Sequence, residues 1–128
     1  MNLLPCLFIG ESPGRGRGVF TSEKIPAGTL LEESPVIVMT GEERKWLDQT
    51  LLHDYIFEWG SQKEHCCMAM GYVPVYNHSS RSNCEYEMEY DRAVIRVRSV
   101  RDIEAGEELF INYHGDWNDP GKLWFEAK

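Results

Sequence analysis

The sequence lacks the features that define several large classes of protein. No apolar run approaches the ~18 residues of a membrane-spanning helix, and there is no internal repeat or low-complexity segment. The net charge of −8 at pH 7 is the reverse of the basic surface that nucleic-acid-binding proteins carry. We therefore expect neither a membrane span nor direct binding to nucleic acid. An acidic surface should instead attract basic partners.

Cysteine is scarce and follows no disulfide framework. The four thiols include the adjacent pair Cys66 and Cys67, and no C-x-x-C motif is present. This usage is typical of a reduced intracellular protein. A zinc site is the alternative, and its ligands would be drawn from His65, Cys66, Cys67, Cys84 and His114. Because this spacing differs from that of the common structural zinc sites, we predict no metal.

The composition that is present indicates one folded domain. A chain of 128 residues with 42% apolar and 27% charged residues is long enough for one core and has ordinary proportions. The first nine residues are mostly apolar, but Pro5 interrupts them and no basic leader precedes them. We expect a first strand there rather than a signal peptide.

Short strands separated by turns account for most of the chain. A glycine-rich turn at residues 10–18 lies between two apolar segments, and residues 36–39 form a short apolar strand. Residues 84–100 alternate between polar and apolar, which predicts a hairpin turning at Asp91 and Arg92. The last predicted strand covers residues 109–113.

One helix is predicted among these strands. Thr40 and Glu43 form a capping box. Apolar residues then recur at helical spacing, at Trp46, Leu47, Leu51, Tyr55, Ile56 and Trp59. The pattern predicts a helix over 41–59 that ends at Gly60 and Ser61. The expected fold class is therefore mainly β with one inserted helix.

The densest group of small polar side chains lies at residues 75–83, between apolar segments on both sides. Asn, His and Ser in such a place need partners, because an unpaired buried polar group costs roughly 1–3 kcal/mol. The stretch is either a structural polar cluster or a site for a polar ligand. The residues alone leave both interpretations open.

A second distinctive stretch is Gly14-x-Gly16-x-Gly18. A dinucleotide-binding fingerprint would need its third glycine one position later and a helix beginning there, whereas a strand follows here. Glycine permits a close approach of the backbone to another group. The stretch is therefore either a loop of that kind or a plain connection between strands.

Three separated stretches together resemble one family. Residues 16–20 (GRGVF), Asn77-His78-Ser79 with Asn83, and residues 106–113 (GEELFINY) occur in the order and spacing of the SET domain. SET domains are protein lysine methyltransferases that use S-adenosylmethionine. The resemblance covers residues 8–117. It implies a β-clip of small twisted sheets with a C-terminal pseudoknot, formed by a single SET domain over 1–128. A helical insert would lie at about 41–70 and an aromatic tail at about 114–128.

The resemblance also implies roles for the residues that match its motifs. The backbone of Gly16, Arg17 and Gly18 would hold the methionine end of the cofactor. Asn77 and His78 would contact its amino group and adenine side, His78 in a structural rather than a catalytic role. The pseudoknot would bring these two residues beside Tyr113.

The catalytic residues implied by the resemblance are tyrosines. Tyr113 would stand at the methyl-transfer site and also contact the cofactor, and Tyr55 would contribute to the lysine channel. Ile111 and Tyr86 would border the same channel. At helical spacing with Leu51, Tyr55 is equally consistent with a core residue.

The sequence departs from the family pattern in three places, one of which is Ile111, since many members have Phe or Tyr two residues before the residue that matches Tyr113. Ser82 stands where a proline usually precedes the second asparagine, so the turn lacks the restraint of a proline ring. No cysteine cluster supplies the zinc-bound tail found in many members. Trp117, Trp124 and Phe125 are then the candidates to close over the cofactor, with Trp117 placed in its site.

The function expected from the resemblance is methyl transfer from S-adenosylmethionine to a lysine side chain, in a basic tail such as that of a histone. The protein would act in the cytoplasm or nucleus, or in the host nucleus if its source is bacterial or viral. Exposed apolar surface makes a homodimer a further expectation. The alternatives are a non-catalytic SET-like module that binds a basic peptide, and a purely structural β-clip domain.

Overall fold

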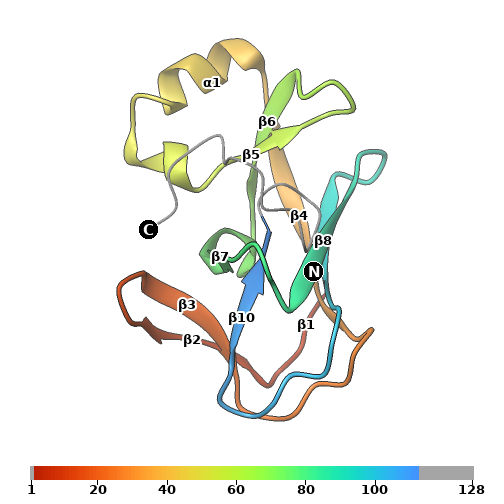
Figure 1. Cartoon of the computed structure of the whole chain (residues 1–128). Helices are drawn as coiled ribbons and strands as arrows, with labels where there is room; N and C mark the ends of the chain where they lie inside the picture. Colours follow the sequence, from red (N-terminus) through yellow and green to blue (C-terminus); the bar gives the residue numbers. More distant parts are fainter. Residues whose placement is uncertain (1, 113–128) are drawn as a thin grey trace.

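Strands dominate the computed structural model, which describes residues 2–112 (Figure 1). The strands are β1 (Asn2–Leu3), β2 (Leu7–Ser12), β3 (Gly16–Thr21), β4 (Leu30–Met39), β5 (Phe57–Trp59), β6 (His65–Ala69), β7 (Asn77–His78), β8 (Cys84–Glu89), β9 (Val94–Ser99) and β10 (Glu108–Ile111). The helical elements are α1 (Gly41–Leu47) and the 3-10 turns η1 (Leu51–Asp54) and η2 (Val73–Val75). The predicted fold class, mainly β with one inserted helix, is confirmed.

The long strand β4 is the centre of the larger sheet. Its strand order is β5-β6-β4-β9-β8, with β1 paired to β4 off this path. The first half of β4 pairs with β1 and β9, and its second half, from Val36 to Met39, pairs with β6. Neighbours of opposite direction therefore brace β4 along its whole length.

The smaller sheet has the order β2-β3-β10-β7. The hairpin of β2 and β3 forms one side, and β10 runs antiparallel to β3. On its other edge β10 is parallel to β7, with Phe110 opposite Asn77 and Ile111 opposite His78. The C-terminal strand is thus inserted between two segments that precede it by a long way in the chain, as the predicted pseudoknot requires (Figure 1).

One apolar core joins the two sheets. Its fully buried members come from both sheets and from the loops between them, and include Val19, Ile25, Leu31, Val73, Ile95, Val97, Ile103, Leu109 and Ile111. Within residues 2–112 no helix is long and apolar enough to cross a bilayer.

Most local predictions agree with the structure. β8 and β9 form the predicted hairpin and turn across Asp91 and Arg92. The capping box is present, because the Glu43 backbone N–H donates to Thr40 Oγ1 and the Thr40 N–H donates to Glu43 Oε1. The predicted strand–turn–strand at the glycines is the β2–β3 hairpin.

The predicted helix over 41–59 is wrong beyond its first turns. The α-helix ends at Leu47, and Thr50 begins the separate turn η1 by accepting a hydrogen bond from the Leu52 N–H. Phe57 and Trp59 are buried on either side of the half-exposed Glu58, which is strand alternation. These residues form β5 of a hairpin with β6, so the insert at about 41–70 is only partly helical.

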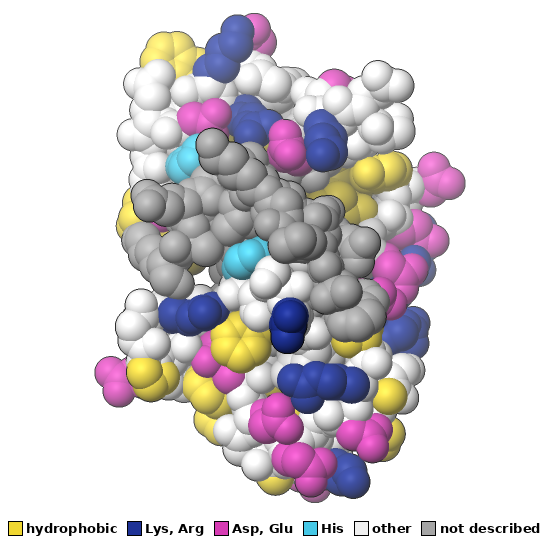
Figure 2. Space-filling view, in the orientation of Figure 1, with side chains coloured by type: hydrophobic (Ala, Val, Ile, Leu, Met, Phe, Trp, Pro, Cys, Tyr) yellow, Lys and Arg dark blue, Asp and Glu magenta, His cyan; other side chains and the backbone are white. Residues whose placement is uncertain are grey.

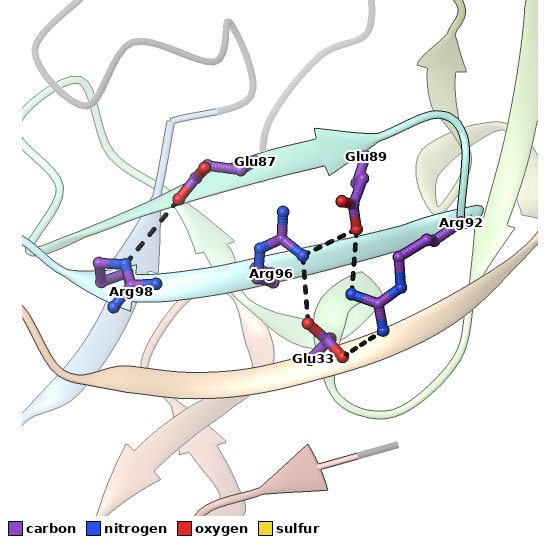
Figure 3. A network of polar contacts seen from close by, with 6 residues as sticks. All are labelled: Glu33, Glu87, Glu89, Arg92, Arg96 and Arg98. Carbon is purple, nitrogen blue, oxygen red and sulfur yellow. Dashed lines mark hydrogen bonds and ion pairs between the residues drawn. The ribbon is translucent and has the colours of Figure 1, made fainter.

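A network of ion pairs lies on one face of β4, β9 and β8 (Figure 3), formed by Glu33, Glu87, Glu89, Arg92, Arg96 and Arg98. Arg96 Nη1 donates to Glu33 at 3.1 Å and to Glu89 at 3.0 Å. Arg92 contacts the same two carboxylates at 3.2 Å each. The bond from Arg96 lowers the pKa of the Glu33 carboxyl. Charges of both signs thereby alternate across this face.

Candidate functional site

The structure brings two of the predicted cofactor segments to the same sheet. Gly16, Arg17 and Gly18 begin β3, while Asn77 and His78 form β7. β10 lies between these strands and pairs with both. Segments separated by about half the chain therefore flank one strand.

Glu108, at the start of β10, holds these segments together. Its Oε1 accepts a hydrogen bond from Ser12 Oγ at 2.6 Å, and its Oε2 accepts one from Asn77 Nδ2 at 2.8 Å. A Cβ added at the buried Gly18 would lie 2.3 Å from Glu108 Oε2 and 2.9 Å from Asn77 Nδ2. Glycine at position 18 is therefore required by the close approach of the backbone to this carboxylate.

The amide of Asn77 is oriented by its neighbours. Nδ2 donates to the carbonyl oxygen of Arg17 at 2.9 Å as well as to Glu108. Both amide protons are thereby used within the described part of the chain, which leaves the amide oxygen to face the other way as an acceptor. An acceptor of this kind fits a ligand ammonium group.

Arg15 ties the glycine turn to β7 and β10. Its Nη1 donates to the carbonyl oxygen of His78 at 2.5 Å, and its guanidinium carbon lies 5.1 Å from the centre of the Phe110 ring. A charged donor on a backbone carbonyl and a cation over an aromatic face are both favourable contacts. No atom of residues 2–112 lies within 4 Å of a Cβ built at Gly16, which has a φ of 78°. Within the described chain this backbone is exposed.

Asn83 fixes β10 from the opposite side. Its Nδ2 donates to the carbonyl oxygen of Glu108 at 2.9 Å, and its Oδ1 accepts from the Phe110 N–H at 2.8 Å. The preceding Ser82 is buried and donates from Oγ to the carbonyl oxygen of Cys84 at 2.9 Å. This hydrogen bond restrains the turn in which Ser82 replaces the family's proline. The polar stretch at 75–83 is thus largely a cluster of satisfied hydrogen bonds.

The predicted channel residues come from three elements. Ile111 is fully buried at the end of β10, opposite His78, and its carbonyl oxygen accepts from the Ser79 N–H at 3.1 Å. Tyr86, on β8, meets Phe57 edge-on at 5.5 Å between ring centres. Tyr55 is 40% exposed where η1 ends, two residues before Phe57 in the chain.

Five of the predicted residues lie outside the described residues. They are His114, considered as a zinc ligand, and Tyr113, Trp117, Trp124 and Phe125, predicted for the site and its cover. Tyr113 follows Asn112 directly, and Asn112 is buried next to the end of β10.

Three residues that organise the site carry no role in the sequence analysis, namely Ser12, Arg15 and Glu108. Glu108 lies within the GEEL motif, and a carboxylate at the start of an apolar strand was the available signal. Arg15 lies inside the glycine turn, where a charged residue normally faces solvent. Only the tertiary contact with His78 distinguishes it.

The four cysteines lie within the described residues, are free thiols and are not arranged to bind a metal ion. Cys6, Cys66, Cys67 and Cys84 are free, and no three His, Cys, Asp or Glu side chains between residues 2 and 112 are grouped to hold an ion. Burial raises the pKa of Cys67 to about 12 and also raises the pKa of Cys84. Protonated, buried thiols of this kind are unreactive.

A C-terminal strand inserted between a glycine-rich strand and an Asn-His strand is the arrangement of a SET domain. The chain belongs to the SET domain family, whose model matches residues 16–114.

A histone-lysine N-methyltransferase of Schizosaccharomyces pombe, specific for H3 lysine 37, is 36% identical over 121 residues. The alignment covers 94% of this chain and 77% of that protein. The predicted enzyme class, protein-lysine N-methyltransferase, is thereby confirmed.

Two solved structures share the fold. A Plasmodium falciparum protein described as a histone methyltransferase superposes with a TM-score of 0.67 and 28% identity, over 90% of this chain and 98% of that one. Polycomb Repressive Complex 2 of Chaetomium thermophilum, in an autoinhibited conformation bound to S-adenosylmethionine, superposes with a TM-score of 0.73. Its identity is 23%, over 91% of this chain and 16% of that chain, so it shows likeness of fold alone.

Proposed function

We propose that this chain transfers a methyl group from S-adenosylmethionine to the side-chain amine of a lysine in a basic protein tail, such as that of a histone. The observation that carries the proposal is the parallel pairing of β7 with β10. This pairing sets Phe110 and Ile111 beside Asn77 and His78, and Tyr113 follows Ile111 by two residues in the sequence. The glycine-rich start of β3 lies on the other edge of β10.

The residues at this site suit the methionine end of the cofactor. The open backbone at Gly16 can approach a ligand, and the oriented amide oxygen of Asn77 can accept from an ammonium group. When bound, S-adenosylmethionine supplies an electrophilic methyl group attached to a positively charged sulfur. Gly16, Arg17, Gly18, Asn77 and His78 are the residues proposed to hold it, and Trp117 is proposed to cover it.

The chemistry requires a neutral amine at the lysine. With a reference pKa near 10.4, deprotonation at pH 7 costs about 4.6 kcal/mol. A dry channel disfavours the charged ammonium form of the lysine. The positive sulfur of the cofactor, at about 4 Å, would destabilise that ammonium by a further roughly 4 kcal/mol at an effective dielectric of about 20. Together these effects are large enough to supply the neutral amine without a strong general base. A channel lined by Tyr55, Tyr86, Ile111 and Tyr113 suits this requirement.

Tyr113 is proposed to align the amine for in-line displacement, a contribution worth several kcal/mol when geometry is enforced. Tyr113→Phe should lower kcat by about 100-fold, the loss typical of one preorganised hydrogen-bonding group. Its Kd for S-adenosylmethionine should change by less than about threefold, a difference below about 0.7 kcal/mol. Mass spectrometry of a methylated H3 peptide and calorimetry measure the two quantities.

Tyr90→Phe is the matched control, because Tyr90 is 46% exposed and packs against Trp59 at the β8–β9 turn. Its turnover should equal that of the wild type. Unchanged turnover of Tyr113→Phe would remove Tyr113 from the mechanism. Binding of the cofactor without transfer to any histone would favour the non-catalytic module.

The substrate class is argued from charge and from the relatives. A net charge of −8 favours encounters with a basic tail. On the face drawn in Figure 2, acidic and basic side chains are intermixed, so attraction arises from the overall charge there rather than from one acidic groove. A histone substrate implies action at chromatin, in the nucleus.

A further inference from the structure

Glu32 is a buried carboxylate that the proposed reaction does not use. It lies on β4, opposite Leu3 and Val97 of the neighbouring strands, and is 1% exposed. Within residues 2–112 its hydrogen-bond partners are Ser34, Tyr72 and Tyr76, and none of them is basic. A carboxylate with only neutral partners is costly to bury, so its position calls for a reason.

Its two oxygens hold both ends of the turn η2. Oε2 accepts from the Tyr72 N–H at 3.1 Å, where Tyr72 is the N-cap and has no side-chain capping bond of its own. Oε1 accepts from Tyr76 Oη at 2.8 Å, where Tyr76 is the C-cap. The backbone approaches closely, since a Cβ at Gly71 would lie 2.4 Å from Glu32 Oε2. One side chain of β4 therefore braces the whole turn.

This turn leads directly into the cofactor segment. Tyr76 is completely buried, and Asn77 follows it. The strand β7 has only two residues and two backbone pairings with β10, so side-chain contacts share in holding its place. The contacts run without a break from Glu32 through Tyr76 to Asn77, whose amide binds Arg17 and Glu108.

We propose that Glu32 is a positioning residue for methyl transfer, which acts through Tyr76 to set the place of Asn77 and His78 at the cofactor site. The inference rests on the proposed function. It assigns Glu32 no contact with the cofactor or the substrate. Its effect should therefore fall on affinity for S-adenosylmethionine and leave the chemical step alone.

The test uses two single-atom deletions that remove different donors from the same carboxylate. Tyr76→Phe removes the bond that braces η2. Ser34→Ala removes the 2.6 Å bond from Ser34 Oγ to Oε2, which lies within β4, and leaves the Tyr76 bond to Oε1 in place. Both variants weaken the buried cluster and should lower Tm by a similar amount, so stability alone does not separate them.

Calorimetry with S-adenosylmethionine separates them. Tyr76→Phe should raise the Kd about tenfold, the scale of one lost hydrogen bond, and raise KM for the cofactor in parallel. Its kcat at saturating cofactor should stay within about twofold of the wild type, and Ser34→Ala should keep the wild-type Kd. Equal Kd values for both variants and the wild type would reduce Glu32 to a stability residue.

Glu32→Gln tests the same coupling from its other partner, alone if Tyr76→Phe does not fold and in a double-mutant cycle if both variants fold. Glu32→Gln retains the shape and should also raise the Kd, and Tyr76→Phe added to it should raise the Kd no further. Independent, additive effects would overturn the coupling. If the wild type itself binds no S-adenosylmethionine, the proposed function fails; if the wild type binds and both variants bind equally well, only the positioning role fails.

Discussion

Glu32 and Glu33 are adjacent residues with opposite surroundings. Because side chains alternate across a strand, Glu32 points into the core while Glu33 joins the ion pairs with Arg92 and Arg96. Burial raises the pKa of the Glu32 carboxyl, although bonds from Ser34, Tyr76 and Tyr72 act in the opposite direction. The pKa of Glu33 is lowered, chiefly by the bond from Arg96.

The raised pKa of Glu32 predicts a pH dependence of stability. At pH values above 4.5, the usual pKa of a glutamate, Glu32 binds more protons in the folded chain than in the unfolded chain. The free energy of unfolding therefore falls as the pH rises toward the pKa of Glu32 in the folded chain. Each unit by which folding raises the pKa of Glu32 corresponds to about 1.4 kcal/mol of unfolding free energy lost over this pH range. Glu32→Gln cannot ionise and should lose this slope. Urea unfolding at pH values from about 4.5 upward measures the difference.

Nearby titratable groups should not interfere in this window. The pKa of Tyr76 and that of Cys84 are both raised by burial, so neither ionises near neutrality. Glu11→Gln, on exposed surface of β2, is the control and should keep the wild-type slope. A wild-type slope in Glu32→Gln would contradict the assignment.

At the scale of elements, the spacing of apolar residues predicts the secondary structure correctly where one face of the element is buried. Residues 84–100 alternate because one face of the β8–β9 hairpin is buried, and the prediction there is confirmed. At 41–59 the spacing from Trp46 to Trp59 also fits a helix. The structure leaves Trp46 73% and Leu51 71% exposed, so these residues form no buried helical face. Residues 57–59 form a strand because they pair with β6.

Local sequence patterns could not predict the site either, because it depends on contacts between distant segments. The pairing of β7 with β10 and the bonds of Glu108 to Ser12 and Asn77 join segments far apart in the chain. No periodicity records such contacts, and the family resemblance alone indicated that these motifs meet. Glu32 was invisible because two consecutive glutamates are normally solvent-exposed.

The ion pairs on β4, β9 and β8 should contribute to stability in a salt-dependent way. Arg96→Ala leaves Glu33 and Glu89 without the guanidinium that they share, so Tm should fall. The fall should shrink at about 1 M salt, where the Debye length is about 3 Å. Arg98→Ala is the control, since Arg98 contacts Glu87 at 3.8 Å and should change Tm little. Equal, salt-independent effects would contradict the network.

For the molecule as a whole, the expected homodimer remains a prediction with a candidate surface. Phe8 is 44% and Ile9 41% exposed on β2, an outer strand of the smaller sheet. Apolar side chains also gather over this hairpin in the space-filling view (Figure 2). Exposed apolar groups on an edge strand favour pairing. Sedimentation should show a dimer, and Ile9→Lys should shift it to monomer without changing the unfolding midpoint substantially.

The control is Ile37→Lys, because Ile37 is 55% exposed on β4, in the other sheet. It should leave the dimer intact. A wild-type chain that sediments as a monomer at all concentrations would refute the expectation, and a dimer broken only by Ile37→Lys would move the interface to the larger sheet.

The insertion of β10 between β3 and β7 has a consequence for biosynthesis. A ribosome releases the glycine hairpin and the Asn-His segment long before the strand that separates them. Until residues 108–111 emerge, β3 and β7 lack the strand that joins them, and a nascent chain cannot assemble the proposed cofactor site. Long-range closure of this sort is slow, so catalytic competence should be the last property that a newly made molecule acquires.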